Sequence, residues 1–492
     1  MNLTLQIVIS VVTALLAVIW VYFKILKIAK DKDLVDNPNA RKLQKTPVPV
    51  MGGIAVFFGM TVGVIVGASL GKALGWVPLF PVFPVVLTMI LMLYCGAMDD
   101  IVGLTPQSRF IIEIVTLLGL IFTTGICADA LHGLWGVENI SWWIAVPLTV
   151  FSGVGIVNAV NMIDGVNGLS SGLCIMSCLL FGTIFLLAGD IPNALLAFVM
   201  VASLFPFFLH NVFGKKSRMF IGDAGTMMMG ILLTWFALST IHRKSNAAFM
   251  LNGNEANMIA MSLAILCVPV FDTVRVMTLR IMRHKSPFRP DKTHLHHVFI
   301  HVGISHSITS LSEIGINLLV VGIATLAVAL GANKDWQLYI VIIASTVLVC
   351  GTYFFLRVQV RHHTEFMHRL ARFSVATHFG DKSWWKRLQQ WLDRREGHAV
   401  TELEKPQNDA AYHITFDKNP NNRKDIDRKM MLEYMKGKAE VYVSDIKEHS
   451  GAERLRVDAL LSEGELEGYV KVITWSTTGA PKIVALAEDV VF

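Results

Sequence analysis

The feature that most constrains the fold of this chain is a series of long apolar segments that carry almost no charge. Only 16% of the residues are charged, whereas soluble domains have about 25%. A helix that crosses a lipid bilayer needs about 20 mostly apolar residues. Segments of that length lie near residues 4–23, 51–70, 78–97, 109–128, 143–160, 168–188, 192–212, 224–241, 257–276, 312–331 and 337–356. The sequence therefore predicts a polytopic α-helical membrane protein with about 11 transmembrane helices.

The positions of lysine and arginine predict how these helices are oriented. The first apolar segment is followed, not preceded, by its lysines, which is the reverse of a secretory signal peptide. This pattern favours a retained first helix with its N-terminus outside, and an odd number of spans then leaves the C-terminus in the cytosol. Basic residues are concentrated in the loops that would face the cytosol. The opposite loops carry only Lys72, Arg243, Lys244 and Lys334.

The chain changes character after residue 356. Residues 357–400 are basic and carry Trp384, Trp385 and Trp391 at near-helical spacing, which predicts amphipathic helices on the inner membrane surface. Residues 401–492 are polar, with strand-like stretches such as "GYVKVITWS" and a helix-like stretch, "DIDRKMMLEYMKG". We therefore expect a membrane-embedded domain over residues 1–356, interfacial helices over 357–400 and a small cytosolic α+β domain of open role over 401–492.

The polar and glycine-rich clusters of the membrane part all fall in loops that are predicted to face the cytosol. In chain order they are "DNPNARKLQKTPVPVMGG", "MDDIVGLTPQSRF", "NAVNMIDGVNGLS", "FGKKSRMFIGDAGT" and "RIMRHKSPFRPDKTHLHHVF". The loops on the other side are short and chemically plain. This concentration predicts one active site at the cytosolic boundary of the membrane.

The basic residues in these loops suit a substrate with several negative charges. Arginine and lysine pair with phosphate groups, and histidine can donate a hydrogen bond to a phosphate oxygen. The candidates are Arg41, Lys42, Arg109, His294, His296 and His297. The sequence has no GxxxxGKS/T motif, so a P-loop site is excluded. The net charge of +6 is mild, and we expect no nucleic-acid partner.

Three further side chains offer the hard oxygen atoms that suit a magnesium ion: Asn161, Asp164 and Asp223. Proteins commonly hold Mg²⁺ by one or two carboxylates together with substrate phosphates. Gly222 and Gly225 flank Asp223 and would allow the backbone to approach a ligand closely.

Each of these patterns also has a purely structural interpretation. Asp223 opens a predicted span and would serve equally as a helix N-cap. Asp99 and Asp100 would equally mark a helix end in water, because a charge at the bilayer centre costs about 3 kcal/mol. Asn158, Asn161 and Asp164 recur every three positions, on one face of a helix, and would equally supply hydrogen bonds between helices. The agreement of the polar loops on one face favours a common active site.

In this order, the motifs closely resemble those of the polyprenyl-phosphate N-acetylhexosamine-1-phosphate transferases, glycosyltransferase family 4, and most of all its WecA-like branch. The resemblance covers residues 1 to about 356, the membrane part. The matching stretches are residues 36–42 with Pro47, Pro49, Gly52 and Gly53, then Asp99–Asp100, residues 158–169, 222–225 and 294–297.

The resemblance implies a reaction and a set of roles. The phosphate of an undecaprenyl-phosphate-like lipid attacks the β-phosphorus of a UDP-N-acetylhexosamine, UMP leaves, and lipid-linked cell-envelope glycan synthesis begins. The implied catalytic residues are Asp99, Asp100, Asp164, His296 and His297. The implied substrate-binding residues are Arg41, Lys42, Arg109, Asn158, Asn167 and His294. The implied ligands of Mg²⁺, which Mn²⁺ can replace in this expectation, are Asn161 and Asp223.

A lipid phosphate needs little help to lose its proton, since the second pKa of a phosphate monoester is about 6. We therefore expect the aspartate pair to position this phosphate rather than to act as a base. The resemblance further implies a multi-pass protein of the bacterial inner membrane, with the active site on the cytosolic face, and it favours a homodimer.

Two departures from the family pattern bear on the substrate. Gln44 stands where the first motif usually has histidine, so a role for that position is not carried over. Leu295 interrupts the three consecutive histidines of the MraY branch, which favours UDP-GlcNAc over a muramyl-pentapeptide donor. An MraY-like phospho-MurNAc-pentapeptide transferase remains the alternative within the enzyme class. A membrane transporter or flippase is the alternative from another class, although transporter sites usually lie at the bilayer midplane between repeats.

Overall fold

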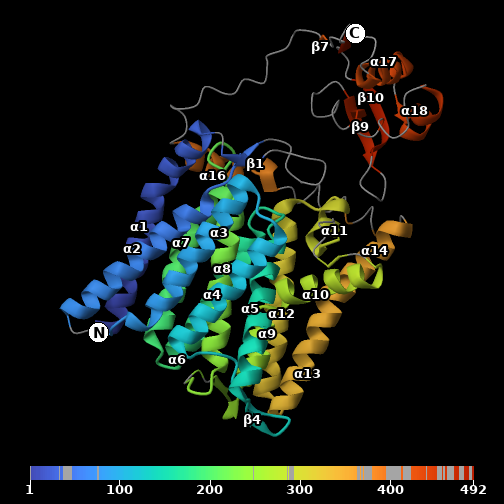
Figure 1. Cartoon of the computed structure of the whole chain (residues 1–492). Helices are drawn as coiled ribbons and strands as arrows, with labels where there is room; N and C mark the ends of the chain where they lie inside the picture. The colour runs from blue at the N-terminus through green and yellow to red at the C-terminus, as the bar shows by residue number, and fades with distance from the viewer. Residues whose placement is uncertain are drawn as a thin grey trace. The chain divides into compact units, whose positions relative to one another are not determined.

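Helices dominate the first of the two units into which the chain divides, residues 1–397 (Figure 1). The computed structural model describes residues 2–32, 34–36, 47–74, 77–245, 247, 249–284, 286–287, 293–362, 366, 370 and 379–394 of this unit. In the second unit, residues 398–492, it describes residues 412–413, 423–438, 440–450, 457, 460–461, 470–475, 481–486 and 490–491.

The predicted spans appear as long helices. Within the described residues, ten helices are long and apolar enough to cross a membrane, and a bent pair is an eleventh candidate. The helices are α1 (Asn2–Asp31), α2 (Gly52–Ala73), α3 (Phe83–Val102), α4 (Pro106–Thr124), α5 (Trp142–Met162), α6 (Leu169–Leu187), α7 (Ile191–Phe213), α8 (Gly222–Ile241), α12 (His306–Ala329), and α13 (Lys334–Ser345) continued through residues 346–351 by α14 (Thr352–His362). The prediction of a polytopic helical membrane protein is confirmed, while its orientation stays a prediction.

The bent pair consists of α9 (Met258–Ile265) and α10 (Cys267–Met282), which meet at an angle of 77°. Pro269 lies in the first turn of α10, where a missing N–H costs nothing. Asn317 of α12 stabilises the break, because its side-chain oxygen accepts from Val268 N at 3.1 Å and its amide nitrogen donates to Ile265 O at 3.0 Å. The backbone groups freed by the bend therefore keep hydrogen-bond partners inside the protein.

Helix α8 is the most enclosed span of the bundle, with 94% of its apolar stretch buried. Its neighbour α3 approaches it closely at Gly96, where a Cβ atom would overlap the backbone of Asp223 and Ala224. This contact brings the C-terminal turn of α3, which carries the aspartate pair, beside the N-terminal turn of α8.

The short strands lie at the two ends of the bundle (Figure 1). At one end, β1 (Val35–Asp36) pairs with β2 (Val48–Pro49) in antiparallel register. Val50, next along the chain, forms a bridge to Phe220 just before α8, and the first polar loop is thereby joined to the fourth. The hairpins β3 (Ala130–Leu134)–β4 (Val137–Asn139) and β5 (Met250–Leu251)–β6 (Asn254–Glu255) join spans whose connections lie at the other end.

Beyond the spans, the first unit ends with a short helix, α16 (Ser383–Asp393), preceded by a 3-10 turn at Phe379–Asp381. The helix is amphipathic, as predicted, because Trp385 and Leu392 are buried whereas Trp384 and Trp391 are exposed.

The described residues of the second unit form α17 (Arg423–Met435), α18 (Val443–His449) and a three-stranded antiparallel sheet. The strand order is β8 (Val441–Tyr442), β10 (Pro481–Leu486), β9 (Val470–Trp475). A parallel pair joins β7 (Tyr412–His413) to β11 (Val490–Val491). A separate apolar cluster that includes Leu432, Ile446 and Val484 is buried among these elements. The cytosolic location and the role of this unit stay predictions.

Candidate active site

A cavity of about 1260 Å³ lies at the end of the bundle where the polar loops meet. Every predicted site residue that the structure describes lines it: Asp99, Asp100, Arg109, Asn158, Asn161, Asp164, Asn167, Asp223, His294, His296 and His297. The two remaining candidates, Arg41 and Lys42, lie outside the described residues. The structure thus brings together side chains from loops that are up to about 200 positions apart in the sequence.

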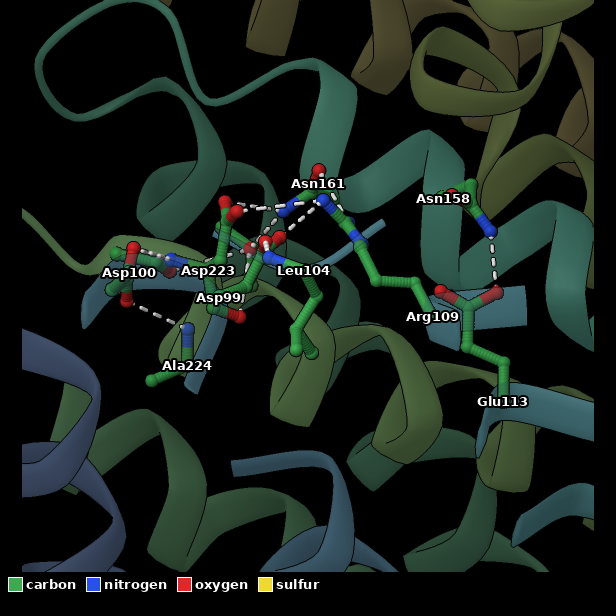
Figure 2. A network of polar contacts seen from close by, with 11 residues as sticks. Asp99, Asp100, Leu104, Arg109, Glu113, Asn158, Asn161, Asp223 and Ala224 are labelled. Atoms are coloured by element: carbon green, nitrogen blue, oxygen red, sulfur yellow. Dashed lines mark hydrogen bonds and ion pairs between the residues drawn. The ribbon is translucent and has the colours of Figure 1, made fainter. Parts of the chain in front are cut away.

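Arg109 is the centre of a polar cluster that joins four helices (Figure 2). Its guanidinium donates to Asp99 Oδ2 at 2.6 Å and to Asn161 Oδ1 at 3.1 Å, and it lies 3.5 Å from Asp223 Oδ2. Asn161 Nδ2 donates in turn to Asp223 Oδ1 at 2.8 Å. Oxygen atoms from α3, α5 and α8 therefore converge on a single cation carried by α4.

This donor set fits a magnesium ion. Two carboxylates, Asp99 and Asp223, and the amide of Asn161 already surround a positive charge, and hard oxygen ligands are those that Mg²⁺ prefers. Among the described residues, no group of three or more His, Cys, Asp or Glu side chains could hold a metal by itself. A bound Mg²⁺ would therefore complete its shell with water and substrate phosphates, as is usual for this ion.

The two adjacent aspartates have different partners. Asp100 accepts hydrogen bonds from the backbone N–H groups of Asp223 and Ala224, at 3.0 and 3.2 Å, and so caps the N-terminus of α8. Asp99 accepts from Leu104 N at 2.6 Å and pairs with Arg109. The N-cap interpretation of Asp223 is therefore wrong, because Asp100 supplies the cap and the Asp223 side chain lies in the polar cluster (Figure 2).

Replacing Gly222 by alanine should destabilise this arrangement. Gly222 has φ +72°, and a Cβ atom there would lie 2.5 Å from Asp100 Oδ2. The left-handed backbone alone costs about 1–2 kcal/mol, so we expect the melting temperature of the purified protein to fall by several degrees, roughly 2–4 °C per kcal/mol. Gly155→Ala is the matched control, since its Cβ would meet no atom within 4 Å. Equal melting temperatures for the two variants would contradict this account of Gly222.

Asn158 lines the cavity, but its amide is already engaged. It donates to Glu113 Oε2 at 2.6 Å and to Val154 O at 2.9 Å. Glu113 is buried, with 1% of its surface exposed, and it was missed by the sequence reasoning. It lies four residues after Arg109 within an apolar segment, and a carboxylate in such a segment is itself a signal of function.

The loop between α5 and α6 carries Asp164, a further carboxylate that lines the cavity. Asp164 accepts a hydrogen bond of 2.5 Å from Ser170, and burial raises the pKa of Asp164 to about 6. Asn167 is fixed through its backbone, since Ser310 Oγ donates to its carbonyl at 2.8 Å. The Asn167 side chain therefore lies on a loop that is tied to α12.

The three histidines lie next to one another on the cavity wall. The rings of His294 and His296 are nearly parallel, 5.6 Å apart, and His297 lies 4.4 Å from His296. Burial, followed by the neighbouring His297 and His294, holds the pKa of His296 well below its usual range, so its ring is neutral at pH 7. His296 packs directly against Gly165, where a Cβ atom would overlap the ring.

A buried ion pair holds the histidine loop and was also missed. Asp272 of α10 accepts from His294 Nδ1 at 2.9 Å and from Arg275 at 2.6 Å. Arg275 also donates to Thr293 O at 2.7 Å, and its guanidinium lies 3.4 Å from the ring centre of Tyr353. Both charges lie inside the predicted span 257–276, and charged residues within a span are a signal of function.

Two further arginines line the cavity, Arg218 and Arg280. In the sequence they are two of the basic residues that the positive-inside rule places in the cytosolic loops. Together with Arg109 they give the cavity several cations, which suits a substrate with more than one phosphate.

The fold and the cavity define a class of protein: a polytopic helical membrane protein with a polar cavity at one end of its helix bundle. Residues 82–241, which span α3 to α8, match the family model for glycosyl transferase family 4.

Curated relatives carry more specific names. A probable undecaprenyl-phosphate N-acetylglucosaminyl 1-phosphate transferase of Bacillus subtilis is 29% identical over 62% of this chain and 81% of its own length. The undecaprenyl-phosphate alpha-N-acetylglucosaminyl 1-phosphate transferase of Escherichia coli K12 is 29% identical over 57% of this chain and 72% of its own length. The protein of the same name from Salmonella typhi is 27% identical.

Proposed function

We propose that this protein transfers N-acetylglucosamine-1-phosphate from UDP-GlcNAc to undecaprenyl phosphate and releases UMP. The observation that carries the proposal is the cluster of Arg109, Asp99, Asn161 and Asp223, which gathers a cation and hard oxygen ligands in one cavity at the end of the spans. The names of the relatives support the choice of sugar and lipid.

The reaction exchanges one phosphoanhydride for another. An oxygen of the lipid phosphate forms a bond to the β-phosphorus of the donor, the bond from that phosphorus to the bridging oxygen breaks, and UMP carries away the electron pair. Asp223 and Asn161, with Asp99 beside them, would hold Mg²⁺, which supplies charge neutralisation on the phosphate oxygens.

The protein residues in this mechanism bind and position the substrates. Arg109 lies where it can orient a phosphate, and Asp100 fixes the N-terminus of α8, so that Asp223 keeps its place. The positive end of the α8 dipole also faces this site. The lipid phosphate is already largely ionised at neutral pH, since its second pKa is about 6, so no residue has to remove its proton.

Removal of the metal is expected to stop the reaction. Chelation by EDTA should lower the transfer rate by about 10²-fold or more, because the ion carries much of the charge stabilisation in such reactions. Added Mg²⁺ should restore the rate, and Mn²⁺ should substitute for it. Full activity in excess EDTA would remove the metal from the mechanism.

The site is proposed to face the cytosol, where UDP-sugars are made. The polar loops at the cavity end carry the basic residues that the positive-inside rule places in the cytosol. We therefore also propose that the protein lies in the bacterial inner membrane, with its N-terminus on the side opposite the cytosol.

A membrane assay with UDP-GlcNAc and polyprenyl phosphate tests the proposed function. We expect a lipid-linked sugar and UMP in equal amounts. UDP-MurNAc-pentapeptide is added as a competitor, and stronger competition than by unlabelled UDP-GlcNAc would favour the MraY-like alternative. The proposal fails if neither product forms with or without Mg²⁺.

A further inference from the structure

We propose that residues 379–394 form one wall of the catalytic cavity and that Asp393 is a positioning residue. In this proposal, Asp393 holds both this wall and the loop that carries Arg218, so that the Arg218 guanidinium can bind a phosphate group of a substrate. The inference rests on the proposed function, because it assigns a role to this segment in that same cavity.

Part of the segment 379–394 lies on the wall of the cavity. Phe379, Gly380 and Trp385 line the cavity together with the residues of the polar cluster. The match to the family model ends at residue 241, so this wall lies outside the matched part of the chain.

An aromatic cluster seals the segment against the bundle. Trp385 is 9% exposed, and its ring centre lies 4.4 Å from that of Phe213, the last residue of α7. Phe379 lies parallel to Trp385, with ring centres 6.2 Å apart. Burial of such large apolar side chains stabilises the contact, so the wall packs as part of the first unit.

Asp393 is held by hydrogen bonds from residues 215–217. The backbone N–H groups of Lys215, Lys216 and Ser217 all donate to its carboxylate, at 3.1, 3.2 and 2.9 Å. Ser217 Oγ donates as well, at 2.6 Å. Burial alone would raise the pKa of Asp393, but these hydrogen bonds hold it below the usual range. The carboxylate is therefore ionised at neutral pH and is held by four donors.

The loop that Asp393 holds connects α7 to α8. On its inner side, Tyr22 donates to Ser217 O at 2.8 Å, and His210 is 2.9 Å from Ser217 Oγ. The loop is thus fixed between the helix bundle and α16. It continues through Arg218 to Asp223, so a shift of the loop would move two residues that line the cavity.

The side chain of Arg218 is largely buried. Its Nε atom is buried and has no hydrogen-bond partner among the described residues. Burial lowers the pKa of Arg218, while the charge of Asp393 raises it. A buried N–H without a partner is costly, and Arg218 lines the cavity, where its guanidinium can donate to a phosphate oxygen. The negative charge of Asp393 behind the loop keeps this cation favourable in its buried place.

Kinetics of Asp393 variants test the proposal. Asp393→Ala should raise the KM for one substrate by about 10-fold, the effect of losing about 1.4 kcal/mol of binding, while kcat changes little. Assays that vary UDP-GlcNAc and polyprenyl phosphate separately show whether the phosphate belongs to the donor or to the lipid. Asp393→Glu should recover part of the affinity, because it keeps the acceptor and its charge.

The control is Trp391→Ala on the outer face of α16, where the side chain is 65% exposed. It should leave both KM values unchanged. Wild-type KM values for both substrates in Asp393→Ala, or a loss of kcat and stability alone, would overturn the positioning role. Absence of activity in the wild-type protein would overturn the proposed function instead, so the two failures are distinguishable.

Chemical labelling gives a second test that remains valid if Asp393→Ala fails to fold. A maleimide should react with the thiol of Gly380→Cys, and UDP-GlcNAc or polyprenyl phosphate should slow this reaction several-fold, because residue 380 lines the cavity. Labelling that neither substrate slows would contradict the assignment of this segment to the cavity wall.

Discussion

Replacing Asp223 by alanine is expected to abolish transfer while the protein still folds and inserts into the membrane. The side chain of Asp223 bonds to Asn161 and lies beside Arg109, and among the described residues it caps no helix end. Loss of its carboxylate removes a proposed metal ligand, so we expect transfer to fall by about 10³-fold or more. The measurement is the rate of lipid-linked sugar formation in membranes with equal amounts of each protein.

Two further variants make this result specific. Asp223→Asn keeps the shape of the side chain but removes its charge, and it should be nearly as inactive as Asp223→Ala. Glu255→Gln removes an exposed carboxylate from the other end of the bundle, where it pairs with Lys334 at 3.3 Å. Exposed ion pairs contribute little, so this variant should keep full activity. An active Asp223→Ala protein would exclude Asp223 from the catalytic site.

The largest loss of stability is expected from Asp272→Ala. Asp272 and Arg275 have side chains that are only 1% and 2% exposed, and removal of one member of a buried ion pair costs about 3–5 kcal/mol. The variant should also release His294 from its hydrogen bond. Thermal unfolding in detergent measures the effect, and we expect a large fall in melting temperature or a failure to accumulate in the membrane.

A double variant separates the charge effect from the loss of packing. Asp272→Leu combined with Arg275→Met leaves no unpaired charge, and such replacements are often neutral or stabilising. We therefore expect the double variant to be more stable than Asp272→Ala, yet poorly active, because His294 still lacks its partner. If the double variant were as unstable as Asp272→Ala, the buried charge would not be the cause.

The sequence predicted the membrane spans and the gathering of the polar residues at one end of them, because both depend on local properties. Long apolar segments identify the helices from residue types alone. The polar loops alternate with the spans, so parity placed Asp99, Asn161, Asp223 and the histidines at one end, and the cavity that they line confirms this grouping.

The sequence could not show contacts that depend on how helices pack. The different partners of Asp99 and Asp100 follow from the close approach of α3 to α8 at Gly96. The place of Asp272 depends on the bend between α9 and α10, which Asn317 stabilises from a distant part of the chain. Periodicity alone treats residues 257–276 as one straight span, so the sequence did not predict the ion pair between Asp272 and Arg275.

The contacts of α16 could not be predicted from the sequence either. The tryptophan spacing predicts amphipathic helices within residues 357–400, and α16 has one buried and one exposed face, but amphipathicity does not say what the buried face covers. The hydrogen bonds from residues 215–217 to Asp393 provide that information.

The central claim is that the β-phosphate of the donor moves together with the sugar, and a labelled donor tests it directly. The purified protein in proteoliposomes that contain undecaprenyl phosphate is supplied with Mg²⁺ and UDP-GlcNAc that carries ³²P in the β-phosphate. We predict that the label appears in the lipid fraction while unlabelled UMP is released in equal amount. Label that stays in released UDP, with only the sugar on the lipid, would contradict the account.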